Sequence, residues 1–316
     1  MIDSEDRDLL RDRIREALAI GDDDFDAIVG DCVDFLDTAP DSAAVAEAAA
    51  EIAKEEFAAY RADQESWPDL LDSDRLLRAF RDLETAGIVA RENFTCCQTC
   101  GTAEIGGEVP EGTETRGYVF CHFQDVQAAV TGHGIFLAYG AFGEDGSATA
   151  GIGEEIVAAL RRHGLTPEWN GDPGQRIEVP MTWRRRRFGR LATWPGGPEP
   201  EAAGPLRVTY CDYGRGRAQD EAVPMSLAES RQVLLDLTPR KGNFATFEGG
   251  SGDVVQMIWE DGPRLWLESP DTAARCSRGR HVTPAEAEDL IRVLADENRA
   301  DLARLGDIEV RPWSAG

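Results

Sequence analysis

Lysine is almost absent from this chain of 316 residues, and its scarcity excludes one large class of nucleotide site. Lys54 and Lys241 are the only lysines, and arginine supplies the rest of the 33 basic residues. A phosphate-binding P-loop places a lysine directly after a glycine. Here Lys54 follows Ala53 and Lys241 follows Arg240, so the sequence contains no P-loop.

A complete dinucleotide fingerprint is also missing. Gly151 and Gly153 are followed by Glu154 and Glu155, and not by the x-x-Gly of that fingerprint. Carboxylates favour a helix N-terminus, but here they occupy the place that a pyrophosphate needs. We therefore predict no nucleotide ligand.

Long apolar stretches are lacking as well. No run is apolar over the length of a membrane span, and the N-terminal MIDSEDRDLL is acidic, so we expect no signal peptide. The seven cysteines are odd in number and scattered, unlike a secreted disulfide framework. These features predict a cytoplasmic protein with reduced cysteines and no membrane partner.

Positive charge is scarce, because 59 acidic residues face 33 basic ones and the formal net charge is −26. Residues 1–90 are the most acidic part, with 25 acidic and 9 basic side chains. Such a surface repels phosphate backbones, so nucleic acid is not expected as a partner, whereas a basic protein is.

One basic patch interrupts this pattern. Trp183 precedes four consecutive arginines at residues 184–187, and Phe188 follows them. Positive charge beside aromatic rings can bind single-stranded nucleic acid. In so acidic a chain we favour an intramolecular clamp onto the acidic helices, or a docking edge for an acidic partner.

The apolar pattern predicts an α+β protein with three folded regions. Residues 1–86 are predicted to form an acidic helical region, and residues 87–187 a central mixed α/β sheet domain. A Pro/Gly/Ala-rich linker at 188–205 precedes a small α+β domain at 206–316. In that last domain we predict one strand, a helix, three strands and a long final helix opened by Thr283.

The strongest chemical motif is NFTCCQTCGTAEI at residues 93–105, which holds three of the seven cysteines. Cys97 and Cys100 form a C-x-x-C followed by glycine, the spacing with which two thiolates face one zinc ion. A structural zinc site needs four ligands, so this spacing supplies half of one.

The remaining ligands must come from elsewhere in the chain. Cys121 and His122 are neighbours on an expected strand, so they point to opposite faces and only one of them can serve the site. We predict His122 as the third ligand and Cys121 as a core residue. Cys96 and His133 are the candidates for the fourth position.

Two alternatives stay open for the motif. A C-x-x-C can cycle between dithiol and disulfide when a helix N-terminus lowers the pKa of one thiol. The sequence after Cys100, GTAEIGGEVPEGTE, does not predict a helix, which weakens this alternative. The cysteines can also form a reduced cluster in a turn without any ligand.

Four segments carry a resemblance to a known family: GIVARENFTCCQTCGTAEI, GYVFCHFQD, IFLAYGA and GLTPEWNGDPGQRIEVPMTWRRR. Through them, residues 82–187 resemble the domain of unknown function DUF6891, a family common in actinobacteria. The resemblance implies tyrosine at the position of Cys121 and a retained histidine at that of His122, and it implies no activity. Residues 206–316 are similar to small immunity-type modules in architecture and acidic charge alone.

We therefore expect a cytoplasmic binding or regulatory protein with a zinc knuckle, and not an enzyme. One alternative is a thiol-redox protein or enzyme that uses Cys97 and Cys100. Another is an immunity-type protein that binds a basic partner. Zinc content, a reversible disulfide and salt-sensitive association distinguish the three.

Overall fold

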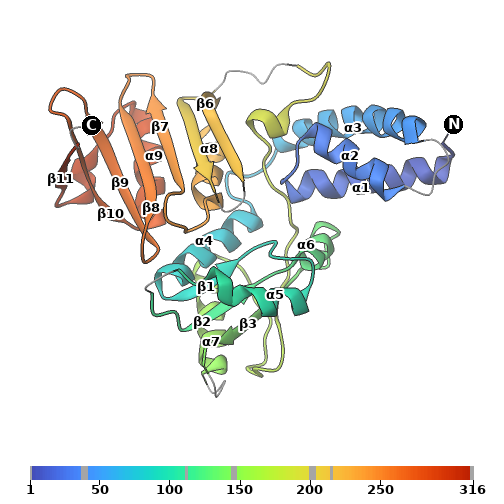
Figure 1. Ribbon diagram of the computed structural model, residues 1–316, viewed down its shortest axis with the longest axis horizontal. Coiled ribbons are helices and arrows are strands. Elements are labelled where there is room, and N and C mark those ends of the chain that lie inside the picture. Colours follow the sequence, from blue (N-terminus) through green and yellow to red (C-terminus); the bar gives the residue numbers. More distant parts are fainter. Residues whose placement is uncertain are drawn as a thin grey trace.

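The computed structural model describes residues 2–36, 42–110, 113–143, 148–198, 204–213 and 216–313. The N-terminal helices and the C-terminal sheet lie at opposite ends, and the central sheet lies between and below them (Figure 1). The predicted α+β class is confirmed. Among these residues, no helix combines the length and the apolar character that a membrane crossing requires.

The N-terminal helices form a unit with its own apolar core. They are α1 (Ser4–Ile20), α2 (Phe25–Phe35) and α3 (Ser42–Gln64). Leu10, Ile14 and Leu18 recur every four residues and are buried on one face of α1. The side chains of Asp3 and Asp24 cap the first turns of α1 and α2, so both helices begin where a capping acid stands.

The central region is a sheet in the order β1-β2-β3-β4, with β1 and β2 parallel and the other pairs antiparallel. Its strands are β1 (Ile88–Arg91), β2 (Gly117–Phe120), β3 (Ile135–Ala141) and β4 (Ile177–Val179). Its helices are α4 (Asp72–Thr85), α5 (Gln98–Glu104), α6 (Phe123–Val130) and α7 (Thr149–Arg162), with a 3₁₀ turn η1 (Ile105–Glu108).

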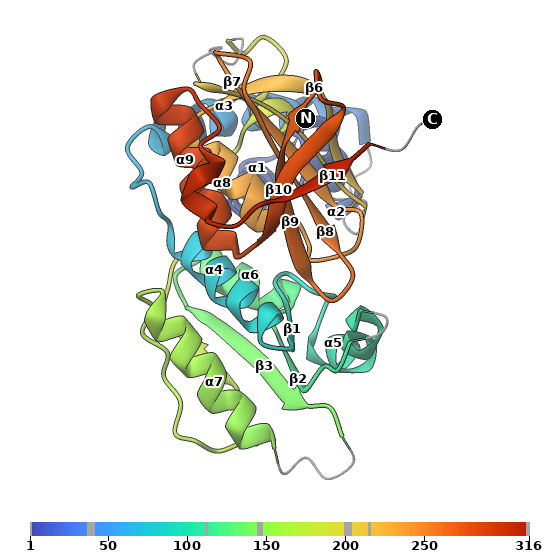
Figure 2. The same cartoon turned by 90° about the vertical axis from the view of Figure 1, so that its left-hand side faces the viewer.

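Different helices cover the two faces of this sheet. Ile88 and Val119 point to one face and share a core with α4 and α7. Val89 and Phe120 point to the other face and pack with Ile105 of η1. Helix α5, which carries the cysteine motif, therefore lies across the sheet from α7 (Figure 2).

The C-terminal region is an antiparallel sheet in the order β11-β10-β9-β8-β7-β5-β6, with α8 and α9 on one face (Figure 2). Its strands are β5 (Leu206–Asp212), β6 (Arg217–Met225), β7 (Phe244–Gly249), β8 (Val254–Glu260), β9 (Arg264–Asp271), β10 (Cys276–Val282) and β11 (Glu309–Pro312). Its helices are α8 (Leu227–Asp236) and α9 (Pro284–Glu297), with a 3₁₀ turn η3 (Leu302–Leu305).

The sequence prediction missed β6, β10 and β11 and made the final helix too long. Helix α9 ends at Glu297 because Asn298 adopts the left-handed conformation, with a φ of 57°. The missed strands are rich in polar residues, and two of them, β6 and β11, form the edges of the sheet. Edge strands need few apolar residues, so their pattern is weak.

The basic segment after β4 joins the three regions. Trp183 lies in the central core, and Phe188 lies in the core of the C-terminal region. The 3₁₀ turn η2 (Gly189–Ala192) follows, and Trp194 then packs against the N-terminal helices. The segment from Trp183 to Trp194 thereby connects the central sheet, which carries the cysteine motif, with the N-terminal helices and the C-terminal sheet.

Candidate thiol and metal-binding site

The cysteine motif lies between the central sheet and solvent. The chain leaves β1 at Arg91, and α5 begins at Gln98 with Cys97 in the N-cap position. The sulfur atoms of Cys96, Cys97 and Cys100 all lie within 4.8 Å of one another. Cys96 is exposed, and the other two are partly exposed. Three thiolates at this separation could hold a metal ion.

Two left-handed residues shape the loop that leads to the cysteines. Asn93 has a φ of 48° and Thr95 a φ of 58°. Asparagine tolerates this region, but for β-branched threonine it costs about 1–2 kcal/mol. Hydrogen bonds from the Phe94 N–H to the Cys121 carbonyl (2.9 Å) and from the Phe123 N–H to the Thr95 carbonyl (3.0 Å) hold the bend. The loop is thus fixed against the segment that joins β2 to α6.

The expectation that no helix follows the C-x-x-C was wrong. Helix α5 covers Gln98–Glu104, and Cys100 lies in its first turn. The helix is short and contains Gly101, so neither its length nor its composition is helical in the sequence. Packing against the sheet supplies the stability that propensity does not. This result removes the main objection to a redox role.

Two of the three thiols differ in acidity. Cys97 makes no capping hydrogen bond of standard geometry, but the nearby N–H of Cys100 and the thiols of Cys100 and Cys96 favour its thiolate. These groups hold the pKa of Cys97 below its ordinary value of 9.0. The thiols of Cys96 and Cys97 raise the pKa of Cys100 to about 11. Of this pair, Cys97 therefore loses its proton first.

Among the described residues, no histidine joins the group of three sulfurs. His122 is buried at the N-cap of α6, with its Nε2 3.1 Å from Asp125 Oδ2. Asp125 is also paired with Arg176. His133 lies on an exposed turn, where its Nδ1 is 3.0 Å from the Thr131 hydroxyl.

One ring nitrogen of His122 makes no hydrogen bond with the described residues. Within the described chain, its Nδ1 is buried and has no hydrogen-bond partner. Burial lowers the pKa of His122, so the ring is neutral at neutral pH. The neighbouring Cys121 is buried in the central core, as predicted, but β2 ends at Phe120, so the expectation that Cys121 and His122 lie on a strand was wrong. Burial raises the pKa of Cys121 well above its ordinary value, so its thiol is inert.

Most arginines of the predicted basic patch make contacts inside the molecule. Arg185 pairs with Asp236 of α8, and Arg186 lies 3.5 Å from Asp74 of α4. Arg187 donates to the backbone carbonyls of Leu18, Asp23 and Leu191. Arg184 is exposed and stacks on Trp67, with its guanidinium carbon 5.2 Å from the ring centroid. These contacts support the interpretation of an intramolecular clamp.

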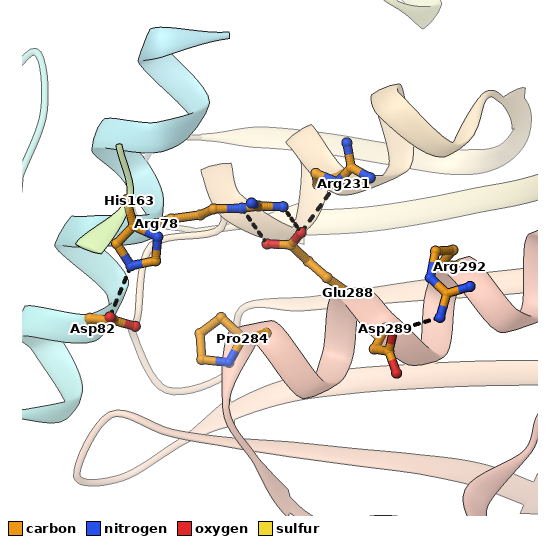
Figure 3. Close-up of a pocket in the computed structure, with 9 residues that line it drawn as sticks. Arg78, Asp82, His163, Arg231, Pro284, Glu288, Asp289 and Arg292 are labelled. Atoms are coloured by element: carbon orange, nitrogen blue, oxygen red, sulfur yellow. Dashed lines mark hydrogen bonds and ion pairs between the residues drawn. The ribbon is translucent and has the colours of Figure 1, made fainter. Parts of the chain in front are cut away.

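A cavity of about 300 Å³ lies between α4, α8 and α9 (Figure 3). The sequence did not reveal it, because its residues come from distant segments. Its ionisable wall residues pair with one another: Arg78 and Arg231 with Glu288, His163 with Asp82, and Arg292 with Asp289. The cavity is therefore part of the contact between the central and C-terminal regions, with no charge left for a ligand among its described residues.

The fold and the thiol cluster define a three-part α+β protein with an exposed group of cysteines on its central sheet. The chain belongs to the family described as a domain of unknown function (DUF6891), whose model matches residues 3–187. This matched range includes the N-terminal helices, whereas the resemblance seen in the sequence covers only residues 82–187. The actinobacterial origin stays a prediction.

One curated relative matches a short part of the chain. The chain is 40% identical over 60 residues to the uncharacterized protein y4hO of Sinorhizobium fredii, a match that covers 19% of this chain. The matched part is 49% of the relative, so the chain spans about half the length of that protein. No solved structure matches the chain.

Proposed function

We propose that this chain is a binding or regulatory protein that takes up a thiophilic metal ion, zinc above all, through Cys96, Cys97 and Cys100. The observation that carries the proposal is the mutual approach of three sulfur atoms within 4.8 Å. A cysteine in a core packs as a small apolar residue, but these three face solvent and serve no core. Metal binding explains why exposed thiols gather at one place.

Three sulfur ligands leave the fourth tetrahedral position of zinc open. Open positions belong to sites that bind a further ligand, whereas closed four-ligand sites hold a fold together. The central sheet already has a continuous apolar core. We therefore assign the ion a role in binding or regulation, with stability of the fold as a secondary effect.

Among the side chains of this chain, His122 is the first choice for the fourth position when no outside ligand occupies it. Its Nε2 lies 3.1 Å from Asp125 Oδ2, and this contact fixes the ring as a carboxylate hydrogen-bonded to a zinc-binding histidine does; its Nδ1 has no partner in the described part of the chain. The backbone bonds of Phe94 and Phe123 place its segment beside the cysteine loop. His133, on an exposed turn beside Thr131, is the second choice.

The test is the metal content of protein purified without chelator. We expect about one zinc per chain in the wild type and in a Cys211→Ser control, and none in Cys97→Ser/Cys100→Ser. Cys211 lies on β5, outside the thiol cluster, so the control removes a cysteine without touching the site. A wild type that stays metal-free after reconstitution with zinc contradicts the proposal.

A second candidate function, thiol–disulfide exchange, is supported by the unequal acidity of Cys97 and Cys100. The Cys97 thiolate attacks a disulfide substrate and releases one substrate thiol; Cys100 then displaces the other, leaving a Cys97–Cys100 disulfide. Two electrons pass to the substrate, which becomes two thiols. Mass spectrometry after incubation with glutathione disulfide tests this: loss of two hydrogens that dithiothreitol reverses supports exchange, and unchanged thiols contradict it.

A further inference from the structure

A second cleft, of about 450 Å³, opens where the three regions meet. The loop after α1, the loop after β1, the turn before β6 and the segment after α8 all contribute to its wall. Four guanidinium groups and four carboxyl groups line it. Its volume lies in the range of small-molecule sites.

Many of these charges are already paired. Arg217 pairs with Asp22, and Arg91 pairs with Glu108 and with Glu84 beneath the cleft. Arg190 pairs with Asp24. Such pairs fix the shape of the wall, but their charges are compensated, so they exert little attraction on a ligand.

Three polar groups of the cleft lack a partner among the described residues. Asp23 is an exposed residue whose carboxylate makes no direct hydrogen bond or ion pair with them; desolvation and the charge of Asp22 raise its pKa, and the guanidinium groups of Arg187 and Arg217 oppose this shift. The guanidinium of Arg240 makes none either. The Oδ1 of Asn93 is buried without a partner, while its Nδ2 donates to Asp22 at 2.8 Å. Asp23 and Arg240 are exposed, so the buried Oδ1 of Asn93 is the uncommon feature, because an unpaired buried acceptor calls for a ligand or water.

The charges and hydrogen-bonding roles of these three groups restrict the chemical class of the ligand. Asp23 and Asn93 offer acceptors, which suit the N–H bonds of an ammonium group, and Arg240 offers the donor fork that binds a carboxylate. A simple anion would use only Arg240 and a simple cation only Asp23 and Asn93, whereas a ligand that carries both charges would use all three. The cavity between α4 and α9 provides the contrast, because its charged groups are all paired with one another.

We infer that this cleft binds a free α-amino acid, with its ammonium group at Asp23 and Asn93 and its carboxylate at Arg240. Phe94 supplies an apolar wall for the side chain of the ligand. The inference does not depend on metal binding by the thiol cluster, because none of the three cysteines lines the cleft.

Isothermal titration calorimetry of the full chain with each common L-amino acid tests the inference. We expect saturable binding of at least one of them at a single site. Asp23→Asn and Arg240→Gln each remove one charge-assisted contact and should raise the Kd about tenfold or more. The matched controls are Asp26→Asn and Arg161→Gln, which change exposed residues outside the cleft and should leave the Kd unchanged.

Blocked ligands give a second readout on the unmodified protein. The Nα-acetyl form and the α-methyl ester of the bound amino acid each lack one of the two charges, and both should fail to bind. Three results overturn the inference: no amino acid binds, the two cleft variants bind as the wild type does, or a blocked form binds as tightly as the free amino acid.

Discussion

A Cβ atom on Gly101 would lie only 2.3 Å from Cε2 of Phe120, which is fully buried on the central sheet. Glycine is therefore the residue that lets α5 lie flat against the sheet. Because Gly101 directly follows Cys100, this close approach also positions the thiol cluster. A Cβ atom on Gly106 or Gly107, a few residues later, would meet no atom within 4 Å.

Gly101→Ala tests this approach. Alanine gains about 1 kcal/mol of helix propensity over glycine, but overpacking a core costs about 1–3 kcal/mol, and here a buried aromatic ring must move. We expect a net loss of stability in urea unfolding, together with weaker metal binding. Gly107→Ala is the matched control and should leave both unchanged. Equal stability of the two variants would contradict the close contact.

The unequal acidity of the thiols predicts an order of alkylation in metal-free protein. A thiolate reacts and a thiol does not, so the rate for Cys97 should rise with pH around a midpoint below 9.0. The midpoint for Cys100 should lie near 11, because the neighbouring thiols oppose its ionisation. Peptide mapping after iodoacetamide treatment gives both rates.

Cys97→Ser provides the control for that order. Since the Cys97 thiol is one of the groups that raise the pKa of Cys100, its removal should bring the Cys100 midpoint down. If the two cysteines of the wild type are alkylated with the same pH profile, the assignment of Cys97 as the more acidic thiol fails.

Arg187 joins the N-terminal helices to the rest of the molecule. Its guanidinium donates to three backbone carbonyls and lies over Phe57, 4.9 Å from the ring centroid. Arg187→Met leaves those carbonyls buried and unpaired, so we expect a loss of about 2–5 kcal/mol in unfolding free energy. Arg184→Met, which changes an exposed arginine of the same segment, should cost far less. Equal losses of unfolding free energy in the two variants would argue against the intramolecular clamp.

The pair formed by Asp82 of α4 and His163 after α7, both in the central region, predicts sensitivity to acid. The hydrogen bond with His163 holds the pKa of Asp82 below its ordinary value of 3.8. A carboxyl with a lowered pKa stabilises the folded state above its unfolded pKa, and this stabilisation disappears as the pH falls through the folded pKa. Asp82→Asn should therefore be less stable than the wild type at neutral pH.

Urea midpoints measured as a function of pH check this prediction. The difference between wild type and Asp82→Asn should narrow as the pH falls below 3.8. A difference that stays constant across that range would show that the ion pair makes no pH-dependent contribution.

Local patterns explain which parts of the fold the sequence predicts. Helices α1 and α2 follow from the periodicity of residues such as Leu10 and Ile14 and from capping acids. Strand β10 does not follow, because its Arg278, Gly279 and Arg280 resemble a loop. Its pairing comes from its register between β9 and β11, which is a tertiary feature.

The candidate sites also divide into features that the local sequence predicts and features that depend on tertiary structure. The C-x-x-C is visible because Cys97 and Cys100 are close in the chain, and Cys96 joins them through the local turn. The left-handed φ of Thr95 has no signature in the sequence, because threonine rarely adopts it. The presence of Asp23 and Arg240 in the wall of one cleft depends on how distant regions meet. The expectation of a basic protein partner stays a prediction.

The most direct test of metal binding counts the thiolates around the ion. Cobalt(II) replaces zinc in tetrahedral sites, and each thiolate ligand adds to its charge-transfer absorption. Titration of the metal-free wild type should saturate at about one cobalt per chain, and Cys96→Ser, Cys97→Ser and Cys100→Ser should each lose about a third of the absorption. Cys211→Ser should lose none. Absence of saturable thiolate absorption in the wild type, or loss of none in all three variants, would contradict a metal site at this cluster.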